Sequence, residues 1–291
     1  MGLRATLLAG AAPMVLAALA IVNGRSRWRA SIAVLRGAME GAREPADVTV
    51  FDARELEGLP APVRRYFGAV LEDGRPVIEA AALSHSGTFN LGGTGDRWVP
   101  FTSVQHIVPR RPGFVWDARV RVAPGLDVFV HDAYAAGEGS LVAKLLGVLT
   151  VARQPSTPEL AQGELTRFFA ECVWCPTALL PSQGMRWEAV DDARARATMR
   201  DGDAEVTLLF GFDGQGLIES VASHGRYRDV DGEQVATPWR GRFWDYRARA
   251  GMLVPLEGEV EWVLPEGPRP YWRGRIERIK YEFAAESGPA R

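Results

Sequence analysis

The stretch Ala204-Glu-Val-Thr-Leu-Leu-Phe-Gly-Phe212 decides the fold class of this chain. Its largest apolar side chains stand at every second position, which is the period of a strand with one buried face. One face carries Val206, Leu208, Phe210 and Phe212, and the other carries Glu205 and Thr207. The next residues are Asp213-Gly-Gln-Gly216, and Asp and Gly tolerate the positive φ angles of tight connections. The stretch therefore predicts a strand that runs into a hairpin turn.

The same combination of strand and turn continues on both sides of this stretch. In the C-terminal third, the strand-like segments are 195–200, 204–212, 217–228, 234–248, 258–264 and 270–283. In the first half, they are 83–91, 97–108, 113–122 and 126–135. Short turns join successive segments, which favours an antiparallel meander over a parallel α/β sheet. We expect a mostly β fold with a large antiparallel sheet and one or two packed helices.

The segment 159–173 has the period of a helix instead. Its apolar side is Leu165, Phe168, Phe169, Cys172 and Val173, and its polar side is Glu164, Arg167 and Glu171. Pro176 ends it. Because a short helix is marginal alone in water, we expect its apolar side to pack against the sheet.

The N-terminal segment 5–22 is an uncharged run of nearly the length that crosses a bilayer. A cleaved signal peptide is the alternative, with Ala18-Leu-Ala20 as its cleavage site. Arg25, Arg27 and Arg29 follow at once, which favours a retained single-pass anchor. Positive-inside counting then predicts that the body of the protein lies in the cytoplasm.

Residues after the predicted anchor have an apolar stripe at helical spacing, formed by Trp28, Ile32, Leu35 and Met39. This helix could lie on an anionic leaflet, form a stalk, or dock on the domain. The expected organisation is an anchor over 1–24, a juxtamembrane amphipathic helix and linker over 25–47, and one β-rich domain over 48–286.

Composition and motifs exclude several function classes. The net charge of −2 argues against a nucleic-acid partner. Cys172-Val-Trp-Cys175 has the spacing of a redox pair, but it lies at a helix C-terminus among apolar residues, so two buried thiols are the better interpretation. The four histidines are scattered, and neither a metal site nor a cofactor is expected. The sequence has no nucleophile-elbow or phosphate-loop motif.

Several local strings resemble those of a widespread bacterial family of unknown function. They are 59–67 (LPAPVRRYF), 132–134 (DAY), 137–139 (GEG), 164–167 (ELTR), 170–179 (AECVWCPTAL), 237–243 (TPWRGRF) and 245–246 (DY). The resemblance covers about residues 57–282 and implies no reaction, and the chain departs from it at Cys175, where an aromatic residue is expected. The layout is also similar to the curved half-barrel of bacterial lipoprotein and lipid carriers, an analogy of fold that implies no function.

A site is expected between the helix and the sheet. Tryptophans with polar tips suit the wall of a pocket for an apolar ligand, although they suit a sandwich core as well. The candidate ligand-binding residues are Trp174 and Trp239 at the rim, Arg167 or Arg240 for an anionic head group, and Glu171 and Tyr134.

Two function classes remain open. The first is non-enzymatic binding or carriage of a lipid-like ligand with an anionic head at the membrane, and the absence of recognisable catalytic motifs favours it. The alternative is a membrane-associated hydrolase or isomerase in which Glu164 or Glu171, with Tyr134 or Asp132, performs acid–base chemistry.

Overall fold

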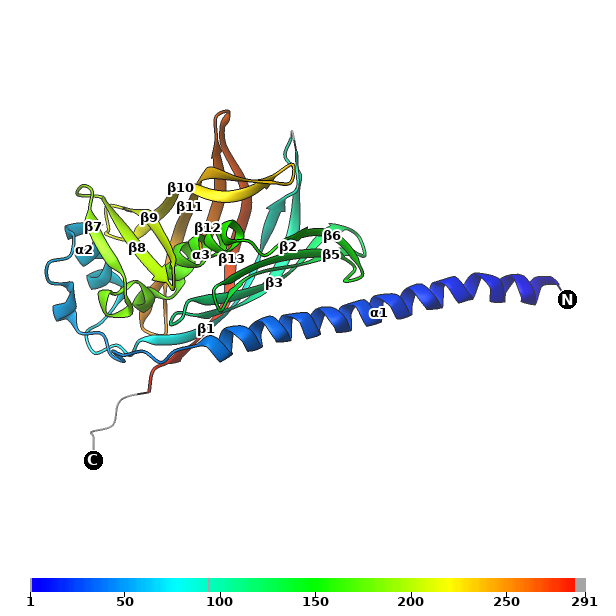
Figure 1. Cartoon of the computed structure of the whole chain (residues 1–291), viewed down its shortest axis with the longest axis horizontal. Coiled ribbons are helices and arrows are strands. Elements are labelled where there is room, and N and C mark those ends of the chain that lie inside the picture. The colour runs from blue at the N-terminus through cyan, green and yellow to red at the C-terminus, as the bar shows by residue number, and fades with distance from the viewer. Residues whose placement is uncertain (1, 94, 286–291) are drawn as a thin grey trace.

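The structure is a computed structural model that describes residues 2–93 and 95–285, with side chains described from Met14 onward (Figure 1). Its strands form one 13-stranded sheet in the order β6-β5-β4-β3-β2-β1-β13-β12-β11-β10-β9-β8-β7. The first six strands are β1 (Ile78–Asn90), β2 (Trp98–Val108), β3 (Gly113–Ala123), β4 (Leu126–Ala135), β5 (Glu138–Leu145) and β6 (Leu149–Gln154). The other seven are β7 (Arg186–Ala189), β8 (Arg194–Asp201), β9 (Ala204–Phe212), β10 (Ile218–Val230), β11 (Glu233–Arg249), β12 (Met252–Leu264) and β13 (Gly267–Phe283).

All neighbouring strands pair antiparallel, as the hairpin turns predicted. Tight turns fix these pairs. At the β9–β10 turn, for example, the Asp213 carboxylate accepts hydrogen bonds from the backbone N–H groups of Gln215 and Leu217 at 2.8 and 2.9 Å. The chain passes from edge strand β6 through α3 (Pro158–Glu171) to the other edge strand, β7. The two halves of the sheet meet where β1 pairs with β13.

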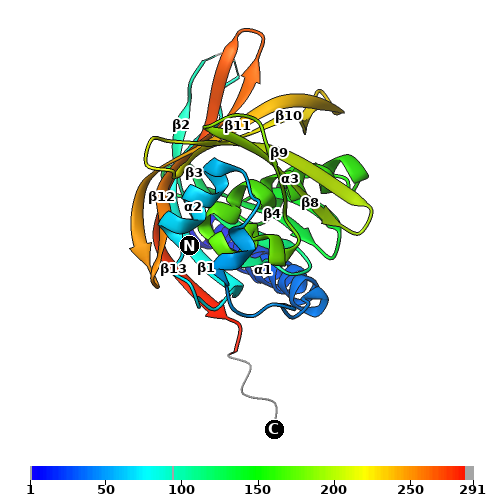
Figure 2. The same cartoon turned by 90° about the vertical axis from the view of Figure 1, so that its left-hand side faces the viewer.

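The sheet curves around α3, which lies on its concave side (Figure 2). The helix begins after Thr157, whose hydroxyl accepts a hydrogen bond from the Leu160 N–H, and Pro158 occupies the first turn. Its side chains Leu165, Phe168 and Phe169 are fully buried, and the Phe169 ring lies 5.5 Å from that of Phe210 on β9. The expectation that this helix packs its apolar side on the sheet is confirmed.

Shorter helical segments complete the core. They are η1 (Ala53–Leu56), α2 (Ala61–Val70), η2 (Cys172–Trp174), η3 (Pro176–Leu179) and η4 (Pro181–Gln183). From α2, Tyr66 and Phe67 are fully buried and meet Phe212 and Trp187. The helix predicted over 159–173 is thus observed as α3 followed directly by η2.

The N-terminal helix α1 (Gly2–Ala42) continues without a break through Asn23 and Gly24, where the sequence predicted the end of an anchor. Its stripe does not face a leaflet, because it packs on the outer face of β3 and β4. Trp28 is 2% exposed and donates a 2.9 Å hydrogen bond from Nε1 to Asp117, and Met39 is 1% exposed. Of the placements considered for this stripe, docking on the domain is the one observed.

Over the described part of the chain, no helix has a stretch long and apolar enough to cross a membrane. The predicted span 5–22 lies in part outside the residues whose side chains are described.

Candidate functional site

A cavity of about 610 Å³ lies between α3 and the concave face of the sheet. Most of its wall is apolar. The apolar part includes Phe89, Leu91, Val120, Val122, Val128, Val130, Leu141, Ala143, Val151, Leu160, Phe243, Val260, Trp262 and Trp272. Along β3 the wall runs from Trp116 to Val122, a stretch of about 20 Å at roughly 3.3 Å per residue. Leu91 and Val151 line the cavity and are also exposed (42% and 53%), so we define the mouth of the cavity by these two residues.

A cluster of buried charged side chains forms the polar wall where α3 faces β4. Arg167 of α3 donates hydrogen bonds to Asp132 of β4 and, at 2.8 Å, to Glu171 one helical turn further on. The second oxygen of Glu171 accepts a hydrogen bond from Gln105 of β2. The Arg167 guanidinium also lies over the rings of Phe114 and Trp116, 4.8 and 5.0 Å from their centroids. Ion pairs and ring faces together hold this arginine in one orientation.

Glu164 carries an unusual carboxyl group in the same cluster. It is 3% exposed, and only one of its oxygens meets a donor, at 3.4 Å from the Arg226 guanidinium. Burial raises the pKa of Glu164 well above 4.5, and the nearby Asp132 carboxylate raises this pKa further. A protonated Glu164 can donate a hydrogen bond to Asp132, whose Oδ1 has no other donor. Burial and the neighbouring carboxylate thus both favour the neutral form of Glu164 in the folded protein.

Arg226 of β10 occupies the other side of α3. It donates to the Gly163 carbonyl at 2.9 Å and to the Tyr271 hydroxyl at 3.0 Å, and the Trp239 indole donates to the same hydroxyl at 2.9 Å. Its guanidinium lies 5.5 and 5.6 Å from the ring centroids of Trp239 and Trp262. The tip of Trp239 is thus fixed by a polar partner, while its ring and that of Trp262 line the cavity.

Arg228, two residues further along β10, also lines the cavity. It donates to the Thr237 hydroxyl at 3.1 Å and lies 5.7 Å from the centroid of Trp262. Among the described residues, no carboxylate lies within ion-pair distance of it. Arg228 is therefore a cation of the cavity wall that can take an anionic partner from outside the chain.

Trp174, in η2, provides a free donor. It lines the cavity, packs on Phe243 and His85, and is 3% exposed. Its indole Nε1–H is buried and has no hydrogen-bond acceptor among the described residues. An unsatisfied buried donor costs about 1–3 kcal/mol, a cost that a ligand with an acceptor atom would remove.

The sequence placed six residues in this site, and the structure distributes them over three environments. Trp174, Trp239, Arg167 and Glu171 line the cavity. Tyr134 is buried away from the cavity wall, and its hydroxyl donates to Asp201 of β8 at 2.7 Å. Whether any of these residues binds a ligand stays a prediction.

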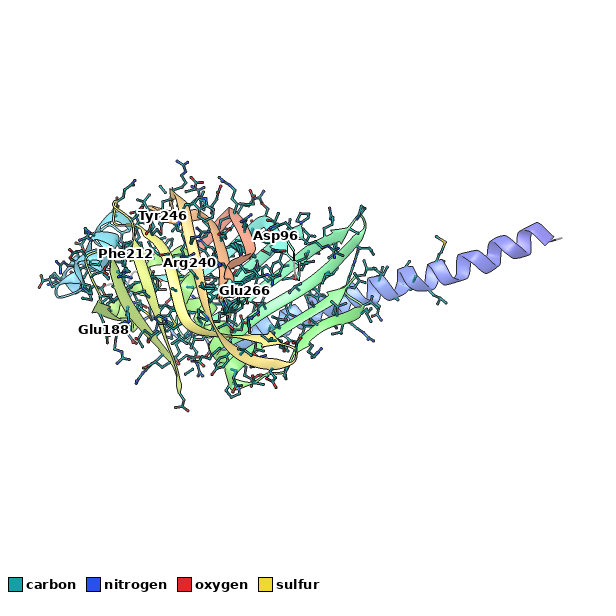
Figure 3. The ribbon with its side chains drawn as sticks, turned by 90° about the horizontal axis from the view of Figure 1, so that it is seen from above. Asp96, Glu188, Phe212, Arg240, Tyr246 and Glu266 are labelled. Atoms are coloured by element: carbon teal, nitrogen blue, oxygen red, sulfur yellow. The ribbon has the colours of Figure 1, made fainter. Side chains whose placement is uncertain are left out.

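Arg240, which the sequence placed at the mouth, is not among the residues that line the cavity. Its position is labelled in Figure 3. It directly follows Trp239, and successive side chains of a strand point to opposite faces. On the convex face it pairs with Glu261 at 2.7 Å, in a ladder of arginines on β11 and β13 that flank the glutamates of β12. The other pairs of this ladder are Arg242 with Glu259, Arg273 with Glu259, and Arg275 with Glu257.

Arg226 and Arg228 were not predicted to bind ligand. Their orientation depends on a β-bulge in β10, where the pairing with β11 shifts between Ser223 and Arg226. Simple alternation counted from either end of the strand does not reveal that shift.

The remaining reactive groups do not join the site. Cys172 and Cys175 are fully buried free thiols, and burial raises the pKa of both. His131 lies on the outer face beside Trp28, and Asp132 points inward, as strand alternation predicted. Burial lowers the pKa of His131 to about 4.

Fold and site together define a class of protein: an open antiparallel half-barrel that holds one helix and encloses an apolar cavity with a polar wall. The chain belongs to a family of unknown function, DUF6920, which it matches over residues 57–281. The resemblance inferred from the local strings is thereby confirmed.

Comparisons with other proteins show only distant likeness. No curated protein matches the sequence. A LolA superfamily protein from Nitrosomonas europaea is 10% identical, with a TM-score of 0.41, over 77% of this chain and 94% of that one. A putative outer membrane lipoprotein-sorting protein domain from Vibrio parahaemolyticus is 8% identical, with a TM-score of 0.36, over 72% and 87%. A beta-barrel-like protein from Brucella abortus is 13% identical, with a TM-score of 0.23, over 71% and 99%.

Proposed function

We propose that this protein binds, without chemical turnover, an elongated apolar ligand with an anionic head group, such as a fatty acyl chain with a carboxylate or phosphate. The observation that carries the proposal is the cavity between α3 and the sheet. Its volume of about 610 Å³ lies within the roughly 300–1,000 Å³ of small-molecule sites, and its wall is mainly apolar.

The polar wall supports an anionic head group. Arg228 has no carboxylate partner within the part of the chain that the structure describes, and a guanidinium binds carboxylate or phosphate with two parallel hydrogen bonds. The free indole N–H of Trp174 is a second donor for a ligand oxygen. Ligand binding of this kind depends neither on the predicted anchor nor on the side of the membrane on which the domain lies.

One observation favours the enzymatic alternative. A buried carboxyl group with a raised pKa, such as Glu164, is a common feature of acid–base sites. Here, however, Asp132 and Glu171 both pair with Arg167, and Tyr134 is engaged by Asp201 instead of facing the cavity. Binding is the function that the geometry supports better.

The test uses the fluorescent fatty acid cis-parinaric acid and its uncharged methyl ester. We expect the protein to bind the acid saturably, and Arg228→Ala to weaken that binding by about tenfold or more while leaving ester binding unchanged, since one charge-assisted hydrogen bond contributes about 1.5–3 kcal/mol. Arg275→Ala, which removes an arginine of the convex face, is the matched control and should change neither.

Filling the cavity provides the complementary variant. Ala143→Trp adds an indole to the wall and should abolish binding of both probes. Unchanged binding by Ala143→Trp, or rapid conversion of the ester to the acid by the wild-type protein, would refute non-catalytic binding in this cavity.

A further inference from the structure

Exposed apolar side chains concentrate at the end of the domain where β5 and β6 turn. Val148, Leu149 and Val151 are 46%, 61% and 53% exposed, and Leu126 on the neighbouring β3–β4 turn is 41% exposed. The two turns are joined, because the Leu146 N–H donates to the Asp127 carbonyl at 2.8 Å. Val151 also lines the cavity, so this apolar surface is continuous with the cavity wall.

Helix α1 brings a second apolar set to the same end. Gly24 of α1 is buried against the β5–β6 turn so closely that a Cβ atom there would lie 2.7 Å from the Gly147 carbonyl oxygen and from Val148. Before this contact, the helix projects beyond the domain (Figure 1). Its projecting part exposes Met14, Val15, Leu16, Leu19 and Val22. We call the two sets together, Leu126, Val148, Leu149 and Val151 with these α1 residues, the apolar end.

The charges around the apolar end have one sign. Residues 14–29 and 139–157 contain no Asp or Glu, whereas they contain Arg25, Arg27, Arg29, Lys144 and Arg153. The outward carboxylates of β3 and β4, Asp117 and Asp127, are already engaged by Trp28 and Arg121. In a chain whose net charge is −2, the positive charge is therefore concentrated where the apolar residues are exposed.

We propose that the apolar end docks on the surface of an anionic lipid bilayer and places the mouth of the cavity against the leaflet. Exposed apolar side chains ringed by arginine and lysine are the combination that binds the interface of anionic membranes. The same positive ring would repel a second copy of the chain. The docking surface consists of exposed residues, so membrane docking does not depend on what the cavity holds.

The experiment places an environment-sensitive NBD label on the full-length protein. In Leu149→Cys, the label sits on the apolar end, and in Val235→Cys it sits on the β10–β11 hairpin, at a control position that is also exposed (40%). The native thiols are buried and should not take up the label. On addition of vesicles of phosphatidylcholine and phosphatidylglycerol, we expect the emission at position 149 to shift to the blue and rise, while that at position 235 stays unchanged.

Charge reversal tests the electrostatic part. Arg25→Glu, Arg27→Glu and Arg29→Glu should each weaken vesicle binding at least about fivefold, and vesicles of phosphatidylcholine alone should bind weakly. The proposal is overturned if the protein sediments with vesicles while the label at 149 does not respond, because α1 alone then binds. Equal responses at positions 149 and 235 would also overturn it. So would a response at position 149 that appears without vesicles when the protein concentration is raised, because the apolar end then contacts a second copy of the chain.

Discussion

Each face of the sheet carries arginines that pair with carboxyl groups, but the surroundings of these arginines differ between the faces. On the concave side, the side chains of Arg167 and Arg226 are 14% and 8% exposed, lie over aromatic rings, and take partners from α3 as well as from strands. On the convex side, Arg240, Arg242, Arg273 and Arg275 are 40–52% exposed and pair across neighbouring strands. Residue type alone therefore does not mark the site, and the face of the sheet does.

The largest difference is expected in stability. Arg167→Met leaves Asp132 and Glu171 buried without their cation, which should lower the free energy of unfolding by about 3–5 kcal/mol. Arg275→Met removes a partly exposed pair and should cost about 0–1 kcal/mol. Urea unfolding followed by tryptophan fluorescence measures both. Equal losses for the two variants would remove the distinction between the faces.

A smaller effect should appear in the pH dependence of stability. The pKa of Glu164 in the folded protein lies above 4.5, its ordinary value in the unfolded chain. At a pH between 4.5 and the folded-state pKa, the folded protein therefore holds a proton that the unfolded chain has lost. This group's contribution is complete below about pH 4.5, and it declines as pH rises towards the folded pKa, by at most about 1.4 kcal/mol per pH unit.

Glu164→Gln keeps a neutral donor in place and removes this dependence. Its stability relative to that of the wild-type protein should therefore increase as the pH rises from about 4.5 towards the folded-state pKa of Glu164, as measured by urea unfolding at each pH. Parallel stability curves for the two proteins would show that Glu164 does not take up a proton on folding.

The smallest effects concern the place where α1 covers the convex face. Gly24→Ala should weaken the docking of α1 by about 1–3 kcal/mol, because the new methyl group meets the Gly147 carbonyl. Gly37→Ala, in the same helix but with open space around it, should stabilise α1 by about 0.5–1 kcal/mol. Hydrogen exchange of the α1 amides separates the two. Protection that increases in both variants would mean that α1 does not pack closely on the β5–β6 turn.

Much of the fold could be predicted from local pattern. The segment 204–212 is observed with the same bounds as β9, and the turns rich in Asp and Gly separate strands as expected. The pattern failed for β5 and β6. The sequence predicted no strands there, because β5 begins within Gly137-Glu-Gly139, whose composition is typical of a turn, and because β6 is an exposed edge strand without alternating burial. The helix α2 was missed as well.

The candidate site could be predicted only in part. A cavity between helix and sheet, with Trp174 and Trp239 in its wall, follows from one short helix that needs an apolar partner. Arg240 was misplaced although strand alternation from Trp239 already sets it on the other face. Arg228 could not be found in this way, because the bulge after Ser223 changes which residues of β10 face inward.

The link between Tyr134 and Asp201 makes the two ends of the cavity unequal. It joins β4 to β8 beyond the polar wall, and Arg111 adds an ion pair to the same aspartate at 3.3 Å. Towards Leu91 and Val151 the sheet has free edges, since β6 and β7 stand at opposite ends of the strand order. The head-group residue Arg228 lies on this open side, over the ring of Trp262, which pairs with Arg269, and Arg269 donates to the Gly92 carbonyl next to Leu91. A ligand held there by its head would point its tail towards the linked end. Selectivity would then act on the length of the acyl chain as well as on the chemistry of the head.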